Sequence, residues 1–493
     1  MGTERIPSRR IIAWIDAQPP QSIRRLLFAC LALFVWSLDT HGNYAGSGDE
    51  PHYGMIAHSL VFDRDLDLSN DYADPANLVG AGTLTPESHA VPGVGGRLRP
   101  VHDIGLPLLS TPVFAVAYWI AERSPSWLPA DLMRRTRLNP PLVLRHLISL
   151  GMIMVAGGVA LVLFDVLLSI ARSKVQAFLW ALVFALSPPL VSHSYLFFTE
   201  IPSALIVLVC FRQLNAGGEI STPRAALLGT LVGVLILLHI RNIGLVGGFV
   251  LWFFWRLRLK PDHLSVALTF VAPLATLAAI RTAINFHFWG TLVSGPLIYY
   301  NAPTEATTTL AEMGARALGL LVDQEHGLLA YAPVYVLTLP GLLMLWRSNR
   351  SLCLALLLMI ASYCLPVLLP MSNPYGWAGG WSPAARFLVP IAPLCAVAAF
   401  ACRASFVTRP RFLTALVALQ WILNAIYWSK PKVLWNDGTG RSALATFISP
   451  SWLDLAPWLP SWHTPSPYST TLSALVVLAW MALSIRASKL AAH

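Results

Sequence analysis

The stretch "RRLLFACLALFVWSLDTHGNYAGSGDEPHY", residues 24–53, decides the fold class. It begins with two arginines, continues as an apolar run over residues 26–38, and ends in a polar segment with two adjacent carboxylates, Asp49 and Glu50. Basic residues before an apolar run are typical of a membrane anchor whose N-terminus stays in the cytoplasm. We therefore interpret the run as an uncleaved transmembrane helix and the polar segment after it as the start of an outer loop.

The composition of the whole chain indicates a membrane protein. Of its 493 residues, 56% are hydrophobic and only 12% are charged, and the mean hydropathy is +0.60. Soluble domains carry about 25% charged residues. The net charge of +10 agrees with basic loops that face an anionic inner leaflet, and the sequence contains no nucleic-acid-binding motif. All six cysteines lie in apolar runs, so neither a disulfide framework nor a CxxC metal motif is predicted.

The charges of the loops predict the topology. We expect an all-α polytopic membrane protein, a single integral membrane domain over residues 1–493 with about twelve transmembrane helices. The apolar segment 104–121 is expected to lie on the outer surface, because a crossing there would turn every later basic loop outward. A large first periplasmic loop with interfacial helices, 41–142, and a C-terminal periplasmic loop, 429–467, follow from this topology. The expected location is the inner (plasma) membrane.

Three acidic residues at outer helix ends, Asp49, Glu50 and Glu200, are candidates for catalysis. Asp49 suits a helix N-cap, with Pro51 in the first turn, but a cap needs only one oxygen, and the chain places Glu50 beside it. Glu200 lies between two apolar runs on the same side and would also suit a helix start. Asp165 lies near a cytoplasmic helix end and is expected to be a solvated flank. We interpret the three outer carboxylates as catalytic groups.

Several cations accompany these acids at the outer side. Arg241 interrupts two apolar runs, and Arg386 begins a span after a loop rich in glycine and tryptophan. Arginine binds phosphate through a bidentate fork, which favours an anionic lipid phosphate as the ligand. The segment "RLRPVHDIGLPLL" adds further polar groups. The expected phosphate-binding residues are Arg241, Arg386, His102 and Arg99, and the residues expected to line the substrate pocket are His52, Tyr53 and Asp103.

Five segments resemble the GT-C fold glycosyltransferases, above all the protein O-mannosyltransferase and aminoarabinose-transferase type. They are "GDEPHY" (48–53), "RPVHDIGLPLL" (99–109), "LVFALSPPLVSHSYLFFTEIPSALIVL" (182–208), "LVDQEHGLLAYAPVYVLTLPGLLML" (321–345) and "GGWSPAARFLVPIAPL" (379–394). The resemblance implies an inverting transferase that uses a polyprenyl-phosphate-linked sugar, such as an undecaprenyl phosphate sugar, at the outer face of the membrane.

The resemblance also implies roles for individual residues. Asp49 matches the proposed base of the first loop, and Glu50 matches the acid beside it, an acceptor contact. Glu200 matches the acid after the third span, Arg241 the basic residue of the fourth outer turn, and His102 a phosphate-approaching Lys or His. No metal ligand is assigned, because the "DxD" position reads "FTEI" here. No cofactor is expected, because the polyprenyl-phosphate sugar is the donor substrate, and metal dependence stays open. The acceptor is expected to be a glycan or lipid rather than a protein.

Two other classes stay open at this point. A multi-span transporter or flippase of lipid-linked saccharides would fit twelve helices, although carriers usually place ionisable residues in mid-membrane. A transferase similar to the O-antigen ligases would carry its catalytic groups in a late outer loop, whereas the acids here come early in the chain.

Overall fold

The computed structural model describes residues 13–36, 48–80, 82–129, 131, 133–134, 138–171, 173–258, 263–292, 309–369, 376–404, 410–436, 438–462 and 466–490. The helices are α2 (Pro20–Trp36), α3 (Glu50–His58), α4 (Ser69–Ala73), α5 (Gly105–Trp127), α7 (Pro140–Ile170), α8 (Lys174–Ala185), α9 (Leu190–His193), α10 (Glu200–Asn215), α11 (Thr222–Leu238), α12 (Ile243–Leu257), α13 (Leu264–Trp289), α15 (Leu310–Val322), α16 (Leu328–Tyr331), α17 (Thr338–Ser348), α18 (Arg350–Leu368), α19 (Ala392–Phe400), α21 (Pro410–Ser429), α22 (Ala443–Ile448) and α23 (Pro467–Leu490).

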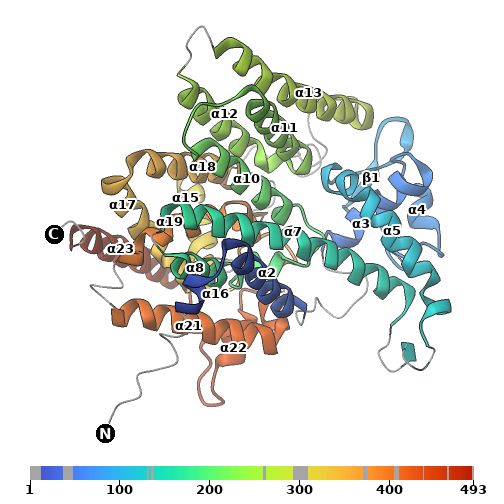
Figure 1. The fold of residues 1–493 in the computed structure, drawn as a ribbon. Helices are drawn as coiled ribbons and strands as arrows, with labels where there is room; N and C mark the ends of the chain where they lie inside the picture. Colours follow the sequence, from blue (N-terminus) through green and yellow to red (C-terminus); the bar gives the residue numbers. More distant parts are fainter. Residues whose placement is uncertain are drawn as a thin grey trace.

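The fold is that of an all-α polytopic membrane protein, as the sequence predicts (Figure 1). In the described parts of the chain, eight helical segments are long and apolar enough to cross a membrane: 105–127, 140–170, 240–257, 264–289, 350–368, 386–403, 411–429 and 467–485. Several other predicted spans fold as shorter helices, among them α2, α8 and α11, so this criterion counts fewer than the expected twelve.

The bundle has a buried centre and an apolar exterior. The segment from Arg386 to Arg403, which contains α19, has 94% of its apolar stretch buried inside the protein. By contrast, only 11% of the corresponding stretch of α13 and 17% of that of α23 are buried, so their leucines, such as Leu268 and Leu478, point outward. An apolar helix with an exposed apolar face is suited to contact lipid. All six cysteines are free thiols.

Contacts at one end of the bundle fix the direction of three helices. Asp165, near the end of α7, pairs with Arg24 at 2.7 Å and Arg212 at 3.0 Å. Arg24 lies near the start of α2, so α2 runs antiparallel to α7, whereas Arg212 lies near the end of α10, so α10 runs parallel to α7. The side chain of Asp165 is only 10% exposed, and the expectation of a solvated flank is wrong, because two arginines cover it.

The antiparallel pairing decides where the first loop joins the bundle. The end of α2 and the start of α7 meet at a common cavity that Trp36 and Val143 both line. The end of α2 and the start of α7 therefore lie at the same end of the bundle, opposite Asp165. The helix α5 has the length and apolarity of a span, but a single crossing by α5 is incompatible with this arrangement. The expected surface position of segment 104–121 stays a prediction.

The described part of the first loop forms a small subdomain at one side of the bundle, drawn in blue to cyan in Figure 1. It contains α3, α4, α5 and a two-stranded antiparallel sheet, β1 (Ala90–Pro92) and β2 (Leu98–Pro100), in which Val91 pairs with Arg99. Its own apolar core joins α3 and α5 to the start of α7 and is made of Met55, Ala57, Val79, Phe114, Ala117, Tyr118, Ala121 and Leu144.

The C-terminal segment is fastened to the bundle by the turn "DQEH", residues 323–326. Asp323 accepts hydrogen bonds from the backbone N–H of His326 at 2.7 Å and of Trp462 at 2.6 Å. Gln324 donates to the carbonyl oxygen of Ala456 at 3.0 Å. This buried turn thus holds the predicted loop 429–467, whose described part contains α22 and two short 3-10 helices, against the start of α16.

Candidate active site

Three of the predicted residues meet in one buried ion cluster. The guanidinium of Arg386 donates from Nε to Glu200 at 2.6 Å and from Nη2 to Asp49 at 2.5 Å. Its Nη1 donates to the carbonyl oxygen of Gly379 at 3.2 Å. The side chains of Arg386 and Glu200 are 7% and 3% exposed, whereas that of Asp49 is 20% exposed. Asp49 is therefore the acid of this triad that a substrate can reach.

Both acids sit at helix starts, as the sequence predicts, but neither acts as a cap. Asp49 occupies the N-cap position of α3, with Pro51 in the first turn, and its side chain makes no capping hydrogen bond. Glu200 is the first residue of α10. The positive end of a helix attracts a carboxylate, so each helix start is a favourable place for an acid that pairs with Arg386. Gly48 adopts φ +50°, and a Cβ there would lie 2.8 Å from the carbonyl oxygen of Trp381.

The backbone before Arg386 is fixed by the "DQEH" turn. Ala385 has φ +58°, a left-handed conformation, and donates its N–H to the carbonyl oxygen of His326 at 2.9 Å. The 3-10 helix Arg386–Ile391 begins directly after it. The guanidinium also lies over the ring of Phe198, 4.1 Å from its centroid, which restricts its orientation. These contacts place Arg386 between the two acids.

Histidines from the first loop cover Asp49 on its exposed side. Nδ1 of His89 lies 3.9 Å from Asp49 and 2.8 Å from Nε2 of His102. The ring of His52 stacks on that of His89 with centroids 3.7 Å apart, and its Nδ1 contacts the hydroxyl of Tyr72 at 2.7 Å. His52 and His102 thus lie beside the triad, as predicted, although His52 is stacked rather than open to a ligand.

The electrostatics of this corner are dominated by burial and by Arg386. Burial raises the pKa of Asp49, but the charges of Arg386 and His102 lower it further, so the pKa lies well below its usual range. Burial, with the neighbouring histidines, lowers the pKa of His52 to about 2. Burial also lowers the pKa of His102 to about 4, although the charge of Asp49 opposes the shift. At neutral pH Asp49 is therefore ionised, and the imidazoles of His52 and His102 are neutral.

The same corner has the donor atoms of a metal site. Asp49, His89 and His102 each offer one ligand atom, and the three atoms lie within 4.8 Å of one another. Two imidazoles and a carboxylate suit a transition metal such as zinc. The sequence analysis assigned no metal ligand, because it sought a second acid near Glu200, whereas both histidines come from the first loop.

The two predicted phosphate-binding arginines of the bundle differ in their partners. Arg241 lies over the ring of Phe387 at 3.6 Å, and within the described residues its buried Nε has no hydrogen-bond partner. Arg386, whose guanidinium lies 5.9 Å from the centroid of the same ring, is held by two acids. Of these two cations, Arg241 thus has fewer polar contacts with the protein.

Arg99 is not brought to the triad. Its guanidinium donates to the carbonyl oxygen of Leu66 at 2.9 Å and lies over the ring of Phe288, which ends α13. These contacts join the hairpin to α13. Arg99 therefore has a structural role in the first loop, and the described contacts do not support its predicted place at a phosphate.

Glu50 and Tyr53 are buried on α3 beside the triad. Glu50 accepts a hydrogen bond from the backbone N–H of Phe197 at 2.9 Å, so it joins the first loop to the segment before Glu200. Tyr53 packs against His102, with ring centroids 4.9 Å apart, and burial raises the pKa of its hydroxyl. Glu50 is 6% and Tyr53 1% exposed, so both pack beside the triad and neither is open to a substrate.

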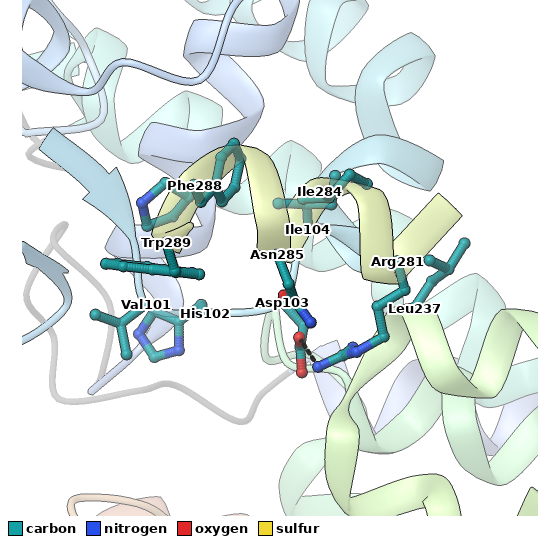
Figure 2. Close-up of a pocket in the computed structure, with 11 residues that line it drawn as sticks. Val101, His102, Asp103, Ile104, Leu237, Arg281, Ile284, Asn285, Phe288 and Trp289 are labelled. Carbon is teal, nitrogen blue, oxygen red and sulfur yellow. Dashed lines mark ion pairs between the residues drawn. The ribbon is translucent and has the colours of Figure 1, made fainter. Parts of the chain in front are cut away.

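Asp103 anchors the first loop to the helices α11 and α13. It pairs with Arg281 at 2.6 Å, as the dashed line in Figure 2 marks, and accepts from the backbone N–H of Ile240 at 2.8 Å. Figure 2 shows this pair on one side of a small pocket and His102 on the other, with Trp289 between the strand and α13. Because Ile240 precedes Arg241, Asp103 fixes the turn that carries Arg241.

Sequence reasoning missed His89 and Arg281. His89 lies in a polar loop just before β1, and no spacing connects it with Asp49, because the hairpin alone brings it back. Arg281 interrupts the apolar pattern of α13, which is the one signal that would have marked it as a partner for a buried acid.

The fold and site define an all-α membrane protein with a buried ion triad at one end of its bundle. No family model matches the sequence, and no curated protein matches it. Among solved structures, the Archaeoglobus fulgidus oligosaccharyltransferase is similar in its apo form, with 12% identity, a TM-score of 0.43 and coverage of 84% of this chain and 55% of that chain. The same enzyme in complex with zinc and sulfate has 12% identity, a TM-score of 0.41 and coverage of 83% and 52%. The chain thus spans about half the length of these structures.

Proposed function

We propose that the protein is an inverting glycosyltransferase that moves a sugar from a polyprenyl-phosphate-linked donor to a glycan or lipid acceptor at the outer face of the membrane. The observation that supports this proposal best is the triad itself. Two carboxylates and one guanidinium are buried at the end of the bundle where the first loop covers it. Burying charged groups is costly, so a partly accessible acid in such a cluster favours a catalytic role.

The three residues of the triad have different roles in this proposal. Asp49, the most exposed of them, accepts the proton of the acceptor hydroxyl. Glu200 is nearly inaccessible and acts through Arg386, so it is a positioning residue. Arg241 and Arg386, which both lie against Phe387, bind the donor phosphate. Glu50 supports α3 through its bond to the segment before Glu200.

The ion pair between Asp49 and Arg386 suggests how donor binding prepares the base. Arg386 holds the pKa of Asp49 low, which makes the free carboxylate a weak base. A phosphate bound to Arg386 would neutralise that guanidinium and raise the pKa of Asp49. The hydroxyl oxygen of the acceptor then bonds to the anomeric carbon while the bond from that carbon to the phosphate oxygen breaks. The phosphate leaves with the electron pair, and its charge is stabilised by the two arginines.

An apolar cavity at the same end of the bundle supports a lipid-linked donor. Its volume is about 540 Å³, and its walls include Val35, Trp36, Leu150 and Tyr195. Tyr195 lies two residues before Phe197, which bonds Glu50. A polyprenyl chain needs an apolar channel next to its phosphate, and this cavity supplies one beside the first loop.

A transfer assay tests the proposal. The detergent-purified protein is incubated with undecaprenyl phosphate sugars and candidate glycan and lipid acceptors, and products are identified by mass spectrometry and their anomeric configuration by NMR. We expect an inverted glycosidic bond and free undecaprenyl phosphate, and none with Asp49→Asn. Lipids from cells without the gene should accumulate the unused donor. Translocation of a lipid-linked saccharide across vesicles without bond formation would instead establish a flippase and overturn the proposal.

A further inference from the structure

A second cluster of metal-binding side chains lies at the far end of α3, away from the triad. The helix α3 ends at His58 and continues as a single π-helical turn, Ser59–Asp63, which is followed by α4. Donor atoms of His58, Asp63 and Asp71 lie within 4.8 Å of one another. We propose that His58, Asp63 and Asp71 bind a zinc-class divalent cation that fastens the end of α3 to α4.

Asp71 provides the observation that points to a ligand. Its side chain is completely buried, and Oδ1 lies 2.6 Å from Nδ1 of His58. The other oxygen, Oδ2, is buried and has no hydrogen-bond partner within the described parts of the chain. A buried carboxylate oxygen without a donor destabilises the fold by about 1–3 kcal/mol or more. A cation at this place would satisfy that oxygen.

The π-helical turn brings the third ligand into place. In a π-helix residue i bonds residue i+5, and here the N–H of Arg64 donates to the carbonyl oxygen of Ser59 at 2.8 Å. The wider turn carries Asp63 back toward His58, five residues earlier. Asp63 remains exposed, so it lies at the mouth of the cluster, where an ion can enter from solvent and keep a water molecule as its fourth ligand.

Neighbouring side chains orient these ligands, as outer partners do in established metal sites. The amide of Asn70 donates to Oδ2 of Asp63 at 2.9 Å. The ring of His58 packs against those of Phe62 and Tyr118, with centroids 4.7 and 5.3 Å away, which fixes its plane. Such second contacts distinguish the cluster from a chance group of surface acids.

The ligand types select the metal. One imidazole and two carboxylates favour zinc and related transition metals, whereas magnesium and calcium prefer oxygen ligands alone. Metal binding requires deprotonated ligands, and two carboxylates with one neutral imidazole bound in this way would carry a charge of −2, which a divalent cation balances. The site needs no residue of the triad and does not depend on the proposed transferase activity.

Zinc binding to the full-length protein tests this proposal. The background variant carries His89→Gln and His102→Gln, which removes the other possible metal site. Protein stripped with chelator is titrated with Zn²⁺ in detergent, and bound metal is measured by elemental mass spectrometry. We expect about one zinc per chain in this background, and a dissociation constant at least tenfold higher after Asp63→Asn. Because Asp63 is exposed, this change leaves folding intact.

Two further variants complete the experiment. Glu122→Gln, at an exposed acid of α5, is the matched control and should bind zinc as the background does. Asp71→Asn should abolish binding, and zinc should raise the melting temperature of the background but not of the two ligand variants. The proposal is wrong if the background binds no zinc, or if Asp63→Asn binds it as tightly as the Glu122→Gln control.

Discussion

The two ends of the bundle carry ion clusters of opposite composition. At one end a single arginine, Arg386, is held between Asp49 and Glu200 and is 7% exposed. At the other end a single acid, Asp165, is held between Arg24 and Arg212, whose side chains are 37% and 46% exposed. Both clusters join segments that are far apart in the sequence. In the first cluster Arg386 and its partner Glu200 are both shielded from water, whereas both arginine partners of Asp165 are partly exposed.

The difference agrees with the catalytic role that we propose for the first cluster, whereas the second joins the ends of three helices. Exposed ion pairs contribute about 0–1 kcal/mol, and arginines near an inner leaflet are ordinary features of membrane proteins. Burying a cluster with one excess negative charge is costly in free energy, so we expect the cluster to serve the proposed function. The cations beside it, Arg241 above all, compensate that excess without forming a direct pair with the acids.

The largest expected effect is on turnover, from the exposed acid of the triad. Asp49→Asn keeps the shape of the side chain and removes the proton acceptor, so transfer should fall by about 10²–10⁴-fold. Steady-state assays on purified protein measure the loss, and thermal melting verifies that the variant is folded. Asp165→Asn is the matched control at the other end. Equal activity of the two variants would remove the functional distinction between the clusters.

The second effect is on stability, from the central arginine. Arg386→Ala leaves two carboxylates buried without a partner, and such a loss typically destabilises a protein by about 3–5 kcal/mol. Arg386→Lys should recover only part of this, because an ammonium lacks the fork that reaches Asp49 and Glu200 together. Melting temperatures of the three proteins measure the effect. Full recovery by lysine would show that charge alone, without geometry, holds the triad.

The third effect is on donor affinity, from Arg241, which has no acid partner among the described residues. Arg241→Ala should weaken binding of undecaprenyl phosphate about ten- to a hundredfold, since a charged hydrogen bond is worth about 1.5–3 kcal/mol. Stability should change less than in Arg386→Ala. Isothermal titration with the lipid phosphate measures the affinity, and an unchanged dissociation constant would make Arg241 a structural residue that packs on Phe387.

The smallest effect is expected at the opposite end. Asp165→Asn should reduce stability by at most about 1 kcal/mol, because Arg24 and Arg212 remain solvated without it. Denaturation at low and high salt measures the change, which should disappear as salt screens the pairs. A loss as large as that of Arg386→Ala would show that the two clusters are energetically alike.

Sequence reasoning recovered the class of the fold and the three members of the triad, because apolar runs and isolated charges at their ends are local signals. It did not predict that Arg386 pairs with the acids, since that depends on how the helices pack. Arg99 was misplaced for a similar reason, because its contact with Phe288 joins β2 to a helix almost two hundred residues later. His89, a candidate metal ligand, was missed, because only the hairpin brings it close to Asp49.

The separation of 337 residues between Asp49 and Arg386 sets the order in which the molecule is assembled. Chains are synthesised at about 5–20 residues per second, so Arg386 follows Asp49 by roughly 20–70 seconds. During this interval Asp49 and Glu200 have no guanidinium between them and must stay hydrated at the end of an incomplete bundle. The triad is therefore among the last contacts to form during biosynthesis, and a chain that stops before Arg386 carries both acids but no site.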